Sequence, residues 1–196
     1  MEPRARARLY TFFSRLFVRE LDDAFVEVLR GELGAALLPT FSASAELDLL
    51  SPAARRQATF DVDFAHLTMV NVVPYESFYR RDDAMIESGG ANPLATFLTK
   101  YGFEADLAAA RSLSPDHLGI ELELMAVLCA READADAPAL AAQVRRVELE
   151  LLSEHLLSWA PVYLLAVRRN ARTGLYAEAA DALLHLLHQH HEALAE

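Results

Sequence analysis

Residues 114–130, with the sequence SPDHLGIELELMAVLCA, constrain the fold more than any other part of the chain. If they form a helix, in which successive residues turn by about 100°, apolar side chains cover two opposite sides. One side carries Leu118, Leu122, Met125 and Cys129, and the other carries Ile120, Leu124, Val127 and Leu128. A helix that is apolar on nearly every face has to be enclosed by other elements. We therefore expect a helical protein packed around this segment.

The start of the central helix is predicted at Ser114. The Ser114 hydroxyl can accept a hydrogen bond from a free N–H of the first turn, and Pro115 has the fixed φ of a first helical residue. Asp116 would face the positive end of the helix dipole. This reading presents Asp116 and His117 at the surface, where they can change without collapse of the fold.

Glu121 interrupts the apolar arc of the same helix. A buried carboxylate usually has a partner, because burying an unpaired charge is costly. His117 lies four residues earlier, a spacing that allows two helical side chains to meet. Two interpretations remain open at this point, a structural pair of Glu121 with His117 and a binding role for Glu121.

The length and composition indicate an all-α protein. A chain of 196 residues with 53% hydrophobic residues, 7 Gly and 8 Pro is long enough for a substantial core and is not of disordered composition. We expect one domain over residues 1–196, with about ten helices and no sheet, possibly as two helical subdomains joined near residues 111–117. Longer helices are expected at 1–17, 21–38, 51–69, 114–130, 139–157, from 158 to a break at 170–174, and 175–194, with short helices at 94–101 and 104–110.

Residues 70–79, with the sequence VNVVPYESFY, are rich in β-branched and aromatic residues, which ordinarily favour a strand. No neighbouring stretch offers a partner strand, and an isolated strand is not stable. We expect an ordered aromatic loop that leads into a short helix. Aromatic loops on a rigid scaffold commonly bind a partner. The alternative is that Tyr75, Phe78 and Tyr79 only fill the end of the helix bundle.

The charge of the chain indicates which partners it can have. A net charge of −11 disfavours nucleic acid and anionic membranes and suits a cationic partner. Residues 1–17 place apolar residues at helical spacing among four arginines, which is typical of an amphipathic helix and not of a signal peptide. The longest apolar stretch, 156–167, contains Ser158 and Pro161 and is too short for a hydrocarbon core of roughly 30 Å. We expect a cytoplasmic protein without an integral membrane segment.

Motifs for metal, phosphate or covalent chemistry are missing from the sequence. Cys129 is the single cysteine, and there is no repeated Glu-x-x-His, glycine-rich phosphate loop, Gly-x-Ser-x-Gly or His-Glu-x-x-His. The last predicted helix carries His185, His188, His190 and His191, whose spacing could hold a metal. The helix dipole at a C-terminus already accounts for histidines there. We expect no metal, no cofactor and no enzymatic activity.

Three blocks of the sequence resemble the TorD/DmsD/NarJ family of cytoplasmic molybdoenzyme chaperones, also called redox enzyme maturation proteins. The first is DFAHLT (63–68) followed by NVVPYESFY (71–79), the second is SPDHLGIELELMA (114–126), and the third is EHLLSWAP (154–161). Two positions depart from the family pattern: Ser114 stands where Glu is frequent, and Thr68 where Phe is usual. Both could alter the preference for a client.

The resemblance implies a non-enzymatic protein that binds the N-terminal twin-arginine signal peptide of an apo-molybdoenzyme until the molybdopterin cofactor is inserted. It also implies the client-binding residues. Together with Glu121 from the helix pattern, these are Phe64, Leu67, Pro74, Tyr75, Ser77, Tyr79, Pro115, Asp116 and His117. The protein is expected as a monomer or a homodimer. A metal-dependent helical-bundle enzyme and a purely structural helical adaptor remain the alternatives.

Overall fold

The computed structural model describes residues 1–70, 72–108 and 110–195. Within these ranges the chain is helical and contains no strand, which confirms the all-α prediction. The chain divides into two compact units. Unit 1 comprises Met1–Val18, Pro74–Ala160 and the chain from Leu187 onward, and unit 2 comprises Arg19–Val73 and Pro161–Leu186. Residues 111–117 therefore lie inside unit 1, and the units do not divide there.

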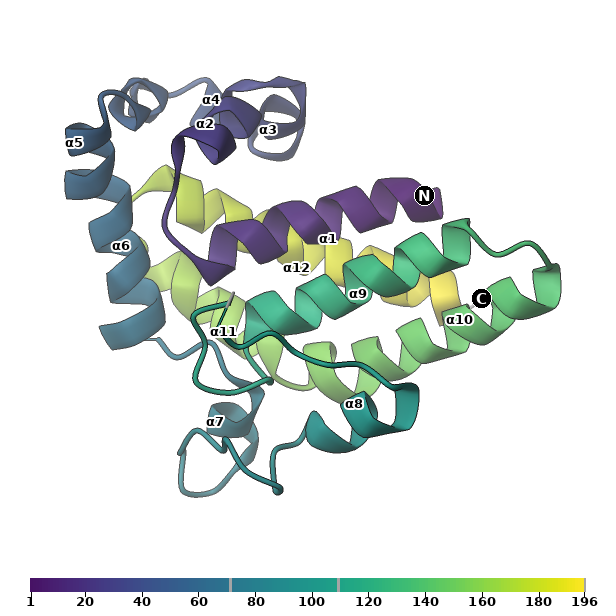
Figure 1. Cartoon of the computed structure of the whole chain (residues 1–196). Helices are drawn as coiled ribbons and strands as arrows, with labels where there is room; N and C mark the ends of the chain where they lie inside the picture. The colour runs from purple at the N-terminus through teal and green to yellow at the C-terminus, as the bar shows by residue number, and fades with distance from the viewer. Residues whose placement is uncertain (71, 109, 196) are drawn as a thin grey trace. The chain divides into compact units, whose positions relative to one another are not determined.

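The predicted central helix is the core of unit 1. It forms α9 (Leu118–Ala133), which packs along α1 (Pro3–Val18) and against α10 (Pro138–Glu150), as Figure 1 shows. Leu118, Leu122 and Met125 of α9 are fully buried. Gly119 allows the close approach of α1, because a Cβ at this position would lie 2.9 Å from the Cβ of Val18. The prediction of a buried central helix is confirmed.

Two shorter helices of unit 1 follow the sequence prediction, and a third does not form. The aromatic loop leads into α7 (Glu76–Arg80), and α8 (Ala95–Tyr101) ends at Gly102, which has a left-handed φ of 65°. The helix expected at 104–110 is absent from its described residues, 104–108 and 110. The chain turns there instead, with Arg111 at a φ of 49° and the Ser112 N–H bonded to the Leu107 carbonyl.

Helix α10 continues through a π-helical segment, η4 (Leu151–Leu156), into α11 (Leu157–Asn170). The helical periodicity of residues 139–157 predicts an inward face made of Leu140, Val144, Val147, Leu151 and Leu152, and this face is only partly buried. Leu151 and Leu152 are fully buried, whereas Leu140 is 45% exposed and Val144 and Val147 are half-buried. The fully buried residue of α10 is Glu148. Two buried side chains contact it, Arg6 of α1 and His190 of α12 (Gly174–Ala195).

Unit 2 begins with a helix pair where one helix was predicted over 21–38. Gly31 separates α2 (Asp23–Arg30) from α3 (Glu32–Leu37), and a Cβ at Gly34 would lie 2.1 Å from the Leu29 carbonyl oxygen. The unit continues with α4 (Pro39–Ser42), the 3₁₀ helix η1 (Ala45–Leu50), α5 (Ala53–Arg56), the π-helical η2 (Gln57–Asp61), α6 (Val62–Ala65) and the π-helical η3 (His66–Val70). The helical run from α5 to η3 confirms the helix predicted at 51–69.

Candidate functional site

The loop before α7 and the segment before α9 pair with each other in unit 1. Tyr75 and His117 form an isolated antiparallel bridge. The Glu76 N–H donates to the Asp116 carbonyl at 3.0 Å, and the Leu118 N–H donates to the Pro74 carbonyl at 2.9 Å. The predicted ordered loop is confirmed, and residues 115–117 are the partner that the sequence did not reveal.

The predicted helix start at Ser114 is wrong. Helix α9 begins at Leu118, and His117 is its N-cap, with Nδ1 accepting a hydrogen bond from the Gly119 N–H at 3.0 Å. Ser114 is committed elsewhere, because its hydroxyl donates to the Glu87 carbonyl and accepts from the Asn92 side chain, both at 2.8 Å. Those partners are more than 20 residues away in sequence, so local capping rules could not identify them.

The predicted exposure of Asp116 and His117 is also wrong. Asp116 is fully buried, and its Oδ2 accepts a hydrogen bond from the Ser77 N–H at 2.7 Å. His117 is 6% exposed, and the ring of Tyr75 packs edge-on against it at 5.1 Å. Burial lowers the pKa of His117 to about 4, so the imidazole is neutral near pH 7. Both residues hold the loop against the helix.

Glu121 does not pair with His117. Its Oε2 accepts a hydrogen bond from the Trp159 indole at 3.3 Å, and its Oε1 has no hydrogen-bond partner in the described part of the chain. The side chain is fully buried. Burial and the neighbouring Glu76 raise the pKa of Glu121 well above its usual value. The structural pair with His117 is thus wrong, and the binding interpretation remains open.

Glu76 is a central residue of this region that the sequence analysis left among the loop residues of exposed type. It is fully buried, with Oε2 at 3.0 Å from His155 Nδ1. Arg80, one turn later, donates to Glu76 Oε1 and also to the Glu154 carbonyl at 3.0 Å. The i, i+4 spacing of Glu76 and Arg80 was the available signal.

The ten predicted client residues divide between the units. Phe64 and Leu67 lie in unit 2 and are buried; the preceding Asp63 accepts the Thr173 N–H and hydroxyl at 2.9 and 2.8 Å, just before α12. The remaining eight lie in unit 1. Of these, Tyr79 and Pro115 are partly exposed, and the others are buried: Pro74, Tyr75, Ser77, Asp116, His117 and Glu121. Asn71, which opens part of the first family block, lies outside the described residues.

Tyr79 is partly exposed and also contacts the buried part of this region. Its ring stacks on Trp159 with 5.5 Å between centroids, and Trp159 in turn binds Glu121. Trp159 is fully buried, and its neighbours within unit 1 include Tyr79 and Glu121. The region thus combines three buried carboxylates, on Glu76, Asp116 and Glu121, with an aromatic cover.

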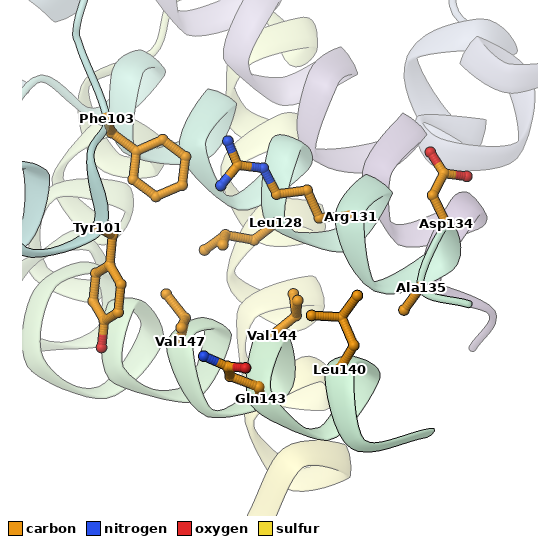
Figure 2. Close-up of a pocket in the computed structure, with 10 residues that line it drawn as sticks. All are labelled: Tyr101, Phe103, Leu128, Arg131, Asp134, Ala135, Leu140, Gln143, Val144 and Val147. Atoms are coloured by element: carbon orange, nitrogen blue, oxygen red, sulfur yellow. The ribbon is translucent and has the colours of Figure 1, made fainter. Parts of the chain in front are cut away.

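A separate apolar pocket lies between α9 and α10 and is drawn in Figure 2. It has a volume of about 400 Å³. The guanidinium of Arg131 lies over the Phe103 ring, 4.7 Å from its centroid. The lining residues are Tyr101, Phe103, Leu128, Arg131, Asp134, Ala135, Leu140, Gln143, Val144 and Val147. The apolar residues of α10 that the sequence placed inside thus face an open pocket.

The histidines of the last helix do not gather into a metal site of their own. His190 is buried, whereas His185 and His188 are exposed. The ring of His188 lies beside Glu192 of the same helix, with 3.4 Å between Nε2 and Oε1. His190 instead binds Tyr10 and Glu148.

Comparison with known proteins decides the family. Residues 18–164 match the family model described as the nitrate reductase delta subunit. The chain belongs to this family. The TorD chaperone of Psychrobacter sp. (strain PRwf-1) is 29% identical over 98% of this chain and 92% of its own length, and that of Salmonella bongori is 26% identical over 94% and 87%. The selenate reductase assembly chaperone protein of Thauera selenatis is 35% identical over 48% of each chain.

The family assignment confirms the resemblance to the TorD/DmsD/NarJ chaperones. These relatives are named as chaperones, a non-enzymatic role, and the prediction that the chain is not an enzyme agrees with them. No solved structure matches the chain significantly. Among the described residues, no helix is both long and apolar enough to cross a membrane.

Proposed function

We propose that this member of the nitrate reductase delta subunit family is a cytoplasmic maturation chaperone for a molybdopterin-containing oxidoreductase. It binds the twin-arginine signal peptide of the apo-enzyme and holds the enzyme back from export until the cofactor is inserted. The family membership and the names of the TorD and selenate reductase chaperones support the maturation role. The net charge of −11 favours a cationic client segment.

The observation that carries the peptide-binding part is the buried carboxylate of Glu121, whose second oxygen has no hydrogen-bond partner in the described chain. An arginine of the client supplies the donors that this oxygen lacks, because charge-assisted hydrogen bonds to carboxylates are stronger than neutral ones. Tyr79 and Pro115 are the partly exposed residues of the proposed region, and the peptide contacts them first. The six other residues predicted in unit 1 complete this region or support it.

Arg80 shows which groups of this region accept hydrogen bonds from a guanidinium. It binds one buried carboxylate, Glu76, and one backbone carbonyl, that of Glu154, while its own side chain is 44% exposed. A client arginine competes with Arg80 for the same acceptors. Removal of the Arg80 side chain in Arg80→Ala is therefore expected to tighten binding of the client peptide.

The test is calorimetric titration with a twin-arginine peptide and with a twin-lysine peptide of otherwise identical sequence. The arginine peptide is expected to bind more tightly, since only a guanidinium has the planar fork that fits a carboxylate and a carbonyl. Binding should also release a proton as Glu121 ionises, which appears as a difference in heat between buffers of different ionisation enthalpy.

Glu121→Gln is the decisive variant, and Glu123→Gln is its matched control, because Glu123 is an exposed residue of the same helix. We expect Glu121→Gln to weaken binding of the arginine peptide and to abolish proton release. Glu123→Gln should bind the peptide with an affinity close to that of the parent. Equal binding of both peptides by the parent, or unchanged binding by Glu121→Gln, would show that this site does not receive the client.

A further inference from the structure

A second cluster of buried polar groups lies in unit 1, apart from the proposed client region. Cys129 of α9, Glu148 of α10 and His190 of α12 bring a sulfur, a carboxylate oxygen and an imidazole nitrogen within 4.8 Å of one another. Cys129 and Glu148 are fully buried, and His190 is 2% exposed. We propose that these three side chains form a binding site for a borderline-soft divalent cation, of which Zn²⁺ is the best example.

The donor set fits Zn²⁺ by its chemistry. Thiolate, imidazole and carboxylate are its usual protein ligands, with bonds of about 2.0–2.3 Å and tetrahedral geometry. Ligand atoms around such an ion lie roughly 3.5 Å apart, so no two of the three ligand atoms need to approach by more than roughly 1.3 Å. His190 Nε2 and Glu148 Oε2 are already 3.1 Å apart.

An unpartnered oxygen in the cluster points to a missing ligand. Oε1 of Glu148 is buried and has no hydrogen-bond partner within residues 1–70, 72–108 and 110–195. Leaving a buried carboxylate oxygen unpaired is costly. A cation bound between Glu148, Cys129 and His190 removes this cost, and the hydrogen bond from His190 to Glu148 is exchanged for two metal bonds.

The surroundings orient the histidine for this role. The Tyr10 hydroxyl lies 2.8 Å from His190 Nδ1. When Nδ1 carries the proton and donates it to Tyr10, the lone pair of Nε2 faces Glu148 and is free for the metal. A hydrogen bond on the second ring nitrogen is the usual companion of a metal-bound histidine.

The charges of the cluster permit a divalent cation despite the presence of Arg6. The Arg6 guanidinium binds Glu132 and lies 3.5 Å from Glu148, and the half-exposed Arg145 lies 3.9 Å from Glu132, so two positive charges stand beside two carboxylates. Binding of Zn²⁺ releases one proton from the Cys129 thiol to water. The exchange of one proton for Zn²⁺ raises the charge of the cluster by one, and the carboxylates of Glu148 and Glu132 lie beside that added charge.

The proposal departs from the sequence-based expectation of no metal, because the three ligands come from three helices and share no spacing motif. It makes no use of the client peptide. A metal here links α9, α10 and α12 of unit 1 and stabilises their packing, since a ligand that binds only the folded state raises stability.

The test starts with chain that has been treated with a chelator and dialysed, and Co²⁺ serves as the spectroscopic probe. The parent is expected to bind one equivalent with a thiolate-to-cobalt charge-transfer band and tetrahedral d–d bands, to exchange Co²⁺ for Zn²⁺, and to melt at a higher temperature with Zn²⁺. A parent that shows no charge-transfer band at saturating Co²⁺ overturns the proposal, whatever the variants do.

Variants separate the buried site from surface histidines. Cys129→Ser and His190→Gln should each lose the charge-transfer band. Tyr10→Phe should lower the affinity for Zn²⁺ by about 10–100-fold. His188→Gln, an exposed change on the same helix, should bind as the parent does. Circular dichroism checks that each variant is folded. If His190→Gln does not fold, Cys129→Ser decides, and Zn²⁺ binding by folded Cys129→Ser with parental affinity refutes the site.

Discussion

The indole of Trp159 donates a hydrogen bond to Glu121 across 3.3 Å, and neither side chain is accessible to solvent. The indole satisfies one carboxyl oxygen only. Burial, with a further contribution from Glu76, raises the pKa of Glu121 well above its usual value. The folded protein therefore keeps a proton on Glu121 at pH values where the unfolded chain has already lost it.

The first prediction is that Glu121→Gln stabilises the protein near pH 7. In the unfolded chain this carboxyl ionises near pH 4.5, and in the folded chain at a higher pH, so the parent loses stability as pH rises above 4.5. The neutral amide avoids that loss. We expect a gain of about 1 kcal/mol near pH 7 that vanishes below pH 4.5, as measured by urea denaturation. A variant less stable than the parent at both pH values would contradict this.

The second prediction concerns acid denaturation and His117. Its pKa falls from 6.5 in the unfolded chain to about 4 in the folded one, so its contribution is present above pH 6.5 and is lost as pH falls towards 4. His117→Asn keeps a capping side chain without this titration. The difference in unfolding free energy between variant and parent should shift by up to roughly 3 kcal/mol in favour of the variant across that window. A difference that does not change with pH would mean that His117 is not buried in the neutral form.

The third prediction tests the contact of α1 with α9. Gly119→Ala places a methyl group 2.9 Å from the Val18 Cβ, which cannot move without its backbone. We expect a loss of about 1–3 kcal/mol in the free energy of unfolding. Val18→Ala removes only the two γ-methyl groups, so the double variant should recover part of the loss. If the losses of the two single variants simply add in the double variant, the strain does not come from the contact between residues 119 and 18.

The fourth prediction compares two leucines of one continuous helical run. Leu151 is fully buried, so Leu151→Ala should cost about 2–5 kcal/mol. Leu140 is 45% exposed at the apolar pocket, so Leu140→Ala should cost less than about 1 kcal/mol. Thermal and urea unfolding of both variants gives the comparison. Equal losses of stability in the two variants would mean that Leu140 is as buried as Leu151, as the helical periodicity predicts.

Local patterns predicted most of the helices, because periodicity and Gly or Pro breaks act within a few residues. Helix α8 with Gly102 and the buried face of α9 are examples. The start of α9 was not predictable in this way. Ser114 and Asp116 resemble capping residues, but their side chains bind Glu87, Asn92 and Ser77 through long-range contacts. Competition between a local and a distant partner is not visible in the local sequence.

The resemblance named residues of the candidate region but not the contacts that their side chains make. The loop around Tyr75 and the segment around Asp116 do meet, which the sequence motifs only suggested. The association of Glu76 with His155, and of Glu121 with Trp159, joins residues 79 and 38 positions apart. Nothing in the spacing of those residues indicates that they pair. The same holds for Glu148, whose partners His190 and Arg6 lie far from it in the sequence.

The division of unit 1 into three separate stretches of chain has a consequence for protein synthesis. Helices α1, α9 and α10 emerge from the ribosome before the final stretch, from Leu187 onward, which supplies His190 to Glu148 and Tyr10. Until that stretch appears, Glu148 in the nascent chain lacks its histidine. Unit 1 therefore reaches its native packing only after translation of its last helix.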